Sequence, residues 1–118
     1  MRSLSVVLLS LLLAGCPAYF SAVVKNQSND NIVMTNYKSS SKITIEPGSE
    51  KEVSWGFNCQ SIILTNGSVI HFIPGRLREE TYVTSGPVTT FKILFKEDHL
   101  FYVTTAGDLI PIREASSC

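Results

Sequence analysis

The chain has 118 residues, of which 44% are hydrophobic, and its ten basic side chains balance ten acidic ones. That length leaves room for one domain. The balanced charge gives no electrostatic reason to expect nucleic acid as a partner.

The first residues have the pattern of an export leader. Arg2 supplies a positive charge, and an apolar stretch of 11 residues follows from Leu4 to Ala14. A helix needs about 20 apolar residues to cross a bilayer, so this stretch is too short to serve as a membrane anchor. We therefore expect residues 1–15 to be a signal peptide.

The leader ends in Leu13-Ala14-Gly15-Cys16, which resembles the lipobox of bacterial lipoproteins at all four positions. The resemblance covers only the first sixteen residues. It implies that the Cys16 thiol carries a diacylglycerol, that the leader is cut before Cys16 and that the new amine is acylated, giving a durable anchor of several acyl chains. In such lipoproteins an aspartate directly after the lipidated cysteine retains the protein at the inner membrane. Here that position is Pro17, which implies that the protein is sorted to the outer membrane and faces the periplasm. The alternative is ordinary cleavage after Ala18, which would release the domain to the periplasm without lipid.

The expected tether between lipid and domain is very short. Residues 16–18 form it, because a run rich in apolar residues begins at Tyr19. The two residues between Cys16 and Tyr19 span about 7 Å when extended. We expect the domain, residues 19–118, to lie close to the lipid surface.

Residues 19–118 show no sustained helical periodicity. Short runs rich in Val, Ile, Thr, Tyr and Phe alternate with turn residues, a spacing typical of β-sandwiches and barrels. We predict an all-β fold, a single small antiparallel β-sandwich of Ig-like or transthyretin-like general architecture. The expected strands are 19–25, 31–36, 42–46, 50–55, 59–65, 68–73, 80–84, 88–96, 99–105 and 109–113.

Asn66-Gly67 is the strongest local turn signal. The dipeptide suits a two-residue type I′ hairpin, which would pair Ile63 with Ile70 and Ser61 with Phe72. Both faces of that hairpin are apolar, so we expect it to be central in the fold.

A second two-residue turn, at Glu97-Asp98, predicts which side chains face the core and which face outward. The expected core face carries Phe91, Ile93, Phe95, Leu100 and Tyr102. The opposite face carries a mixed basic and apolar strip of Lys92, Leu94, Lys96, His99, Phe101 and Val103. We interpret the strip, with Lys92, Leu94, Lys96 and Phe101 as its candidate binding residues, as a partner surface; burial under another sheet is the alternative. Pro111 cannot donate to a ladder, so the last strand is expected at a sheet edge.

The cysteines predict one disulfide. If Cys16 carries lipid, Cys59 and Cys118 remain as an even pair in an oxidising compartment. A reactive thiol or a metal ligand is the alternative for these two residues. Neither has a Cys-x-x-Cys partner, and His71 and His99 show no ligand spacing, so we expect neither a metal site nor a cofactor.

Catalytic motifs are not evident. Ser39-Ser40-Ser41-Lys42 matches the loose Ser-x-x-Lys pattern of penicillin-recognising enzymes, but the lysine leads into a strand and the partner motifs are missing. No nucleophile elbow or convergent carboxylate pair is present, and we expect no enzyme. The charged connection at 74–80 offers Arg76 and Arg78 as residues that could grip carboxylates, unless it is an ordinary polar loop.

These observations predict a lipid-anchored, non-catalytic interaction module whose partner is a periplasmic or envelope protein. The roles considered are an immunity or inhibitor lipoprotein and an accessory subunit of an envelope assembly. One alternative is a carrier of a small apolar or lipid ligand, for which a large cavity inside the sandwich would be the mark. The other is a purely structural envelope protein.

Overall fold

The computed structural model describes residues 19–35, 41–57, 59–75 and 79–118. The predicted leader and tether, residues 1–18, therefore lie outside the described residues. No helix in the described part of the chain has the length and hydropathy needed to span a membrane. The elements are β1 (Tyr19–Asn26), β2 (Ile32–Thr35), β3 (Lys42–Ile45), β4 (Glu50–Ser54), β5 (Gln60–Leu64), β6 (Val69–Ile73), the 3-10 turn η1 (Glu79–Thr81), β7 (Tyr82–Ser85), β8 (Val88–Lys96), β9 (His99–Val103), β10 (Leu109–Pro111) and β11 (Arg113–Ala115).

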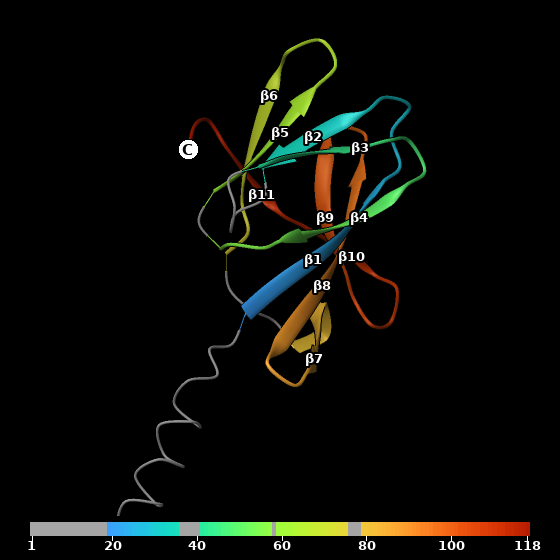
Figure 1. The fold of residues 1–118 in the computed structure, drawn as a ribbon, viewed down its shortest axis with the longest axis vertical. Helices are drawn as coiled ribbons and strands as arrows, with labels where there is room; N and C mark the ends of the chain where they lie inside the picture. Colours follow the sequence, from blue (N-terminus) through green and yellow to red (C-terminus); the bar gives the residue numbers. More distant parts are fainter. Residues whose placement is uncertain (1–18, 36–40, 58, 76–78) are drawn as a thin grey trace, which may run out of the picture.

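The strands form two sheets packed as a β-sandwich, as predicted (Figure 1). The six-stranded sheet has the order β10-β9-β8-β1-β4, with β7 also paired to β8. The five-stranded sheet has the order β11-β6-β5-β2-β3. Most neighbouring strands are antiparallel, but β1 and β8 run parallel along eight paired positions. One edge of β8 pairs with β1. The other edge pairs with β7 near the start of β8 and with β9 near its end.

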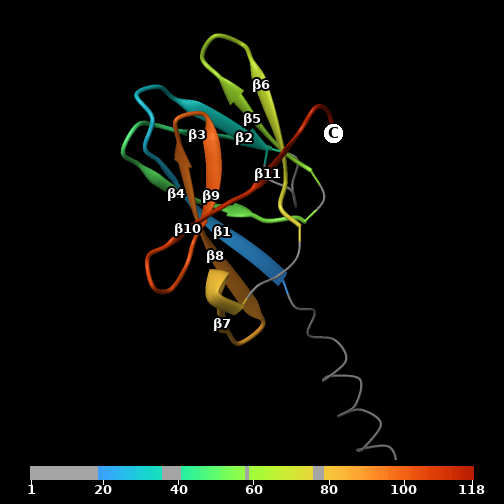
Figure 2. The same ribbon diagram turned by 180° about the vertical axis from the view of Figure 1, so that it is seen from behind.

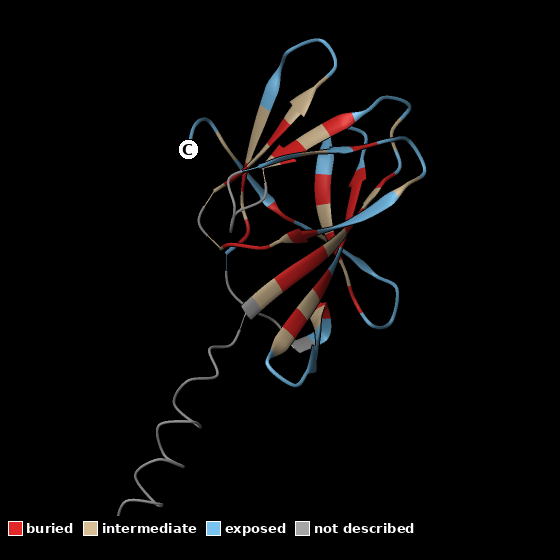
Figure 3. Cartoon of the chain, viewed as in Figure 1, coloured by how far each residue is buried: buried red, intermediate tan, exposed pale blue. Residues whose placement is uncertain are grey.

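The core lies between the two sheets, where buried residues are concentrated (Figure 3). Period-2 alternation explains its composition: on β1, Ala22 and Val24 are fully buried, whereas Val23 between them is half-buried on the opposite face. At its centre, the ring of Phe91 lies 5.6 to 6.3 Å from the rings of Phe20, Phe57, Tyr82 and Tyr102. These aromatic rings pack against one another in the core between the two sheets.

A buried asparagine closes the end of the core where β1 turns toward β2. Asn26 is fully buried, and its amide donates to the carbonyl oxygens of Asp30 at 2.8 Å and Ile45 at 2.9 Å. Its side-chain oxygen accepts from the backbone N–H and the hydroxyl of Ser28. Each polar atom of this side chain is therefore paired, which removes the penalty of burying it.

The hairpin between β8 and β9 confirms the predicted two-residue turn. Glu97 and Asp98 both have positive φ angles, 52° and 62°, as a type I′ turn requires. The register pairs Lys96 with His99 and Phe95 with Leu100. The predicted core side chains, Phe91, Ile93, Phe95, Leu100 and Tyr102, are all buried.

The predicted register of the other hairpin was wrong by one residue. Ile63 pairs with Val69, and Ser61 pairs with His71 rather than with Phe72. The loop has three residues, because Leu64 bonds Ser68 through its N–H and Gly67 alone takes a positive φ, 86°. This is a type I turn followed by a glycine bulge. The hairpin does lie inside its sheet, between β2 and β11.

The last predicted strand, 109–113, is two strands in different sheets. β10 pairs with β9 at the edge of the six-stranded sheet, which confirms the edge position predicted from Pro111. The chain then crosses at Ile112, which is buried, and β11 pairs with β6 in the five-stranded sheet (Figure 2). The burial of Ile112 between the sheets explains why the strand divides there.

Candidate functional site

The predicted partner strip lies on the outward face of the six-stranded sheet. Because Phe91, Ile93 and Phe95 point into the core, Lys92, Leu94 and Lys96 point away from it. Phe101 on β9 faces Leu94 directly. No sheet in the described part of the chain covers this face, so the alternative of burial under another sheet is not what the structure has.

Strand register assembles one continuous row of side chains across this face. Five strands contribute one residue each, in the order Glu50, Lys25, Leu94, Phe101 and Pro111. The row runs from an acidic edge at β4, past a lysine, to an apolar centre and a proline edge. Leu94 is only 9% exposed although it faces outward, since longer side chains flank it on both sides.

Around the Glu50, Lys25 and Leu94 part of this row the surface is hollowed, with a volume of about 750 Å³. Val23, Leu94 and Val103 come from neighbouring strands of the sheet, β1, β8 and β9, and form the apolar base. Tyr82 and Val83 of β7 line the hollow as well. The backbone bond from Thr105 N–H to the Glu80 carbonyl, 3.0 Å long, ties the β9–β10 loop to the η1 turn. Both of these segments contribute lining residues, so the hollow depends on that junction.

The lining combines apolar surface with cations and hydroxyl groups. Lys25 and Lys92 are its basic residues and Glu50 is its acidic residue. Its threonines are Thr81, Thr90, Thr104 and Thr105. A ligand suited to this lining is apolar along its length and carries a carboxylate, which a lysine ammonium and hydroxyl donors can bind.

The remaining predicted surface residues do not join the hollow. Lys96 is exposed and faces His99 beyond the end of the lining. The His99 Nδ1–H donates a hydrogen bond to the Glu114 carboxylate oxygen Oε1 at 2.9 Å, and the His99 ring meets Phe101 edge-on. Arg76 and Arg78 lie outside the described residues. The structure thus brings Lys92 and Leu94 into a hollow, and leaves Lys96 and Phe101 on the open sheet beside it.

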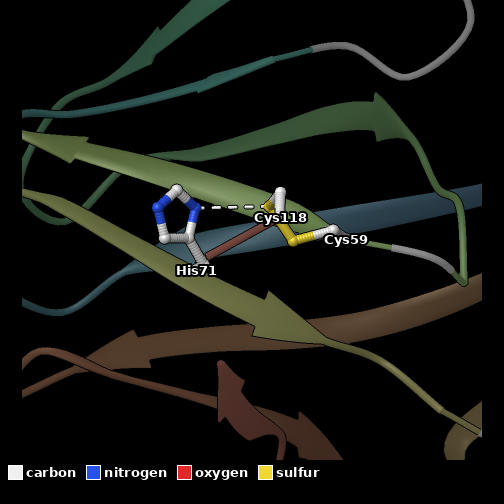
Figure 4. A group of neighbouring side chains, drawn as sticks. All are labelled: Cys59, His71 and Cys118. Atoms are coloured by element: carbon white, nitrogen blue, oxygen red, sulfur yellow. Dashed lines mark hydrogen bonds between the residues drawn. A yellow bond between two sulfur atoms is a disulfide. The ribbon is translucent and has the colours of Figure 1, made fainter. Parts of the chain in front are cut away.

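The predicted disulfide between Cys59 and Cys118 is present, with the two Cα atoms 5.5 Å apart. It lies against the outward side of the five-stranded sheet, opposite the hollow. His71 lies beside it (Figure 4), with its Nδ1 atom 3.2 Å from the Cys118 sulfur. The same Nδ1 atom is 2.9 Å from the Ser61 hydroxyl. That hydroxyl is itself 3.2 Å from the same sulfur.

Sequence reasoning missed this cluster. The feature that could have revealed it is the length of the β5–β6 turn. With a three-residue loop, Ser61 pairs with His71. Cys59 lies two residues before Ser61, and therefore on the same face of the sheet. In the described part of the chain, the only group that gathers three or more His, Cys, Asp and Glu ligand atoms contains His71 and the two cysteines.

Comparisons of the chain with protein-family models, with curated proteins and with solved structures find no match. The class that the geometry itself defines is a disulfide-bonded, all-β sandwich with a hollow on the outward face of one sheet.

Proposed function

We propose that this chain is a lipid-anchored protein of the bacterial envelope that works without catalysis, by binding a partner protein on the outward face of its six-stranded sheet. The observation that carries the proposal is the hollow at Val23, Leu94 and Val103, with two lysines in its lining. Val83 and Leu109, which also line the hollow, are exposed. Exposed apolar side chains rimmed by polar groups are typical of interaction sites.

The anchor part of the proposal rests on the Leu13-Ala14-Gly15-Cys16 motif. β1 begins at Tyr19, three residues after Cys16, so lipidation there would hold this end of the sandwich close to the bilayer. Tyr19 pairs with Val88, beside the β7–β8 turn (Figure 1), so with a lipid on Cys16 that turn would be the part of the sandwich nearest the bilayer. The hollow lies along the side of the sheet, where a neighbouring envelope protein can reach it. We place the protein at the outer membrane, facing the periplasm.

The partner segment that fits this face is apolar and carries an acidic side chain. Val103 and the exposed Leu109 would contact its apolar residues, and Lys92, which is exposed, would pair with its carboxylate. Such a partner is consistent with an immunity or inhibitor role, and equally with an accessory subunit of an envelope assembly. A second candidate uses the same hollow for an acyl chain with a carboxylate head, because its volume of about 750 Å³ is within the range of small-molecule sites.

Site-specific photo-crosslinking in the native host separates these candidates. A photoreactive amino acid replaces Val103 in the hollow, and the matched control replaces Thr44, which is exposed on β3 of the other sheet. We expect a discrete protein adduct from position 103 and none from position 44. Lys92→Glu should weaken that adduct about tenfold or more, as expected for loss of a charge-assisted bond. Lys42→Glu, on β3, should leave it unchanged.

Equal adducts at both positions, or no effect of Lys92→Glu, would refute the protein-binding proposal. A small lipid adduct at position 103 would instead support the acyl ligand. The anchor is tested separately: mass spectrometry of the mature chain should show an acylated Cys16, and Cys16→Ser should move the protein out of the membrane fraction. An unmodified N-terminus at Tyr19 would contradict lipidation.

A further inference from the structure

We propose that Cys59, Cys118 and His71 form a binding site for a soft divalent metal ion of the zinc type when their disulfide is reduced. This site is independent of the proposed partner surface, because it lies on the outward side of the other sheet. It would give the sandwich two states, a disulfide-bonded one and a metal-bound one.

The ligand atoms are already gathered. The two sulfurs and a His71 ring nitrogen all lie within 4.8 Å of one another. In a tetrahedral zinc site with Zn–S bonds of about 2.3 Å and Zn–N bonds of about 2.0 Å, a sulfur and a nitrogen are roughly 3.6 Å apart. Nδ1 of His71 and the Cys118 sulfur are 3.2 Å apart, so that edge of the tetrahedron needs to open only slightly.

The edge that must open most is the one between the two sulfurs, to about 3.8 Å by the same bond lengths. Cys118 is exposed and follows the last strand, β11, which ends at Ala115. Its side chain can therefore turn away from Cys59 without disturbing a paired strand. Cys59 directly precedes β5 and is half-buried, so the other half of the site stays in place.

The donor set favours zinc over calcium or magnesium, because two thiolates and an imidazole are soft or borderline ligands. Ser61 supports the arrangement, since its hydroxyl lies 3.2 Å from the Cys118 sulfur and can donate to a thiolate there. Three protein ligands leave one coordination position for water.

The chemistry balances in two steps. A dithiol reductant gives two electrons and two protons to the Cys59–Cys118 bond, forming two thiols, and is itself oxidised to a disulfide. The metal ion then displaces both thiol protons, so binding releases two protons to solvent. In the reverse direction, a disulfide oxidant would take two electrons from the two thiolates, re-forming the Cys59–Cys118 bond, becoming a dithiol itself and releasing the metal ion.

The test measures zinc binding to the full chain, purified in mild detergent, with a chromophoric chelator as competitor. The chain reduced with a phosphine should bind one Zn²⁺, and the oxidised chain should not bind at this site. His71→Ala and His71→Gln should each weaken binding at least tenfold, the glutamine variant keeping the side-chain bulk beside Ser61. His99→Ala is the matched control, because His99 is exposed on β9 and bonded to Glu114; it should leave binding unchanged. Cys16→Ser controls for the third cysteine and should also leave binding unchanged.

A second readout is the absorption of Co²⁺ bound to the reduced chain, which reports a tetrahedral site with thiolate ligands. The proposal is overturned if the reduced chain binds Zn²⁺ no more tightly than the His71 variants. It is also overturned if the oxidised chain binds equally well, or if His99→Ala removes the binding.

Discussion

Removal of the disulfide should destabilise the sandwich by a calculable amount. The bond between Cys59 and Cys118 joins residues 59 positions apart, so it closes a loop that holds β5 through β11. In the chain-entropy model a loop of that length restricts the unfolded chain by about 4 kcal/mol at 25 °C. A domain of this size has a total unfolding free energy of about 5–15 kcal/mol, so the loss would be a large fraction of it.

The loss should be visible as a change in cooperative unfolding. We expect the Cys59→Ser/Cys118→Ser double variant to lose about 4 kcal/mol in urea unfolding and to melt roughly 15–30 °C lower. β11 has only three paired residues, so its contacts with β6 should be the first to exchange their amide hydrogens. Ser116→Ala, in the exposed tail beside Cys118, is the control and should unfold as the wild type does. A loss below about 1 kcal/mol would refute the chain-entropy reasoning for this domain.

Three further changes test the core and its turns. Asn26→Ala removes four hydrogen bonds of a fully buried side chain, including two from Ser28, and should cost about 3 kcal/mol in urea unfolding; a loss below about 1 kcal/mol would contradict this account of the turn. Burial raises the pKa of Tyr102, while the hydrogen bond from Trp55 works against that shift. As pH rises, the Tyr102 hydroxyl therefore loses its proton in the unfolded chain before it does in the folded one. The unfolding free energy should fall as pH rises above about 10, and fall less steeply in Tyr102→Phe. Parallel curves of unfolding free energy against pH for the two proteins would exclude Tyr102 as a cause. Gly67→Ala forces a side chain into a φ of 86° and should lower the unfolding free energy by about 1 kcal/mol, measured by thermal unfolding. An unchanged melting temperature would contradict this account of the β5–β6 turn.

The two hairpins explain how far local sequence determines this fold. At Glu97-Asp98 the two-residue turn predicted from the sequence leads to the observed register, in which Phe95 pairs with Leu100 and both reach the core. At Asn66-Gly67 the turn dipeptide predicted the wrong loop. Ile62 and Phe72 are both fully buried, and a two-residue loop would have put them on opposite faces of the sheet. Burial of those two side chains therefore outweighed the local preference.

The candidate sites depend on pairings that no local pattern specifies. The row at Leu94 was predictable as an outward strip, since alternation on β8 requires it. Its neighbour Lys25 was not, because Lys25 of β1 and its partner Leu94 of β8 are 69 residues apart in the chain and their parallel pairing is a property of the whole sheet. The hollow needs β7 and the β9–β10 loop beside that sheet as well.

From the order of its residues alone, this chain is specified as an all-β domain with one disulfide, because strand alternation and cysteine parity act within short stretches or by count. Tertiary structure decided the rest: which strands pair, that the chain changes sheets at Ile112, and that His71 and Ser61 lie against the two sulfurs. The physical reason is that burial of side chains from distant segments selects one register among several that the local turns allow.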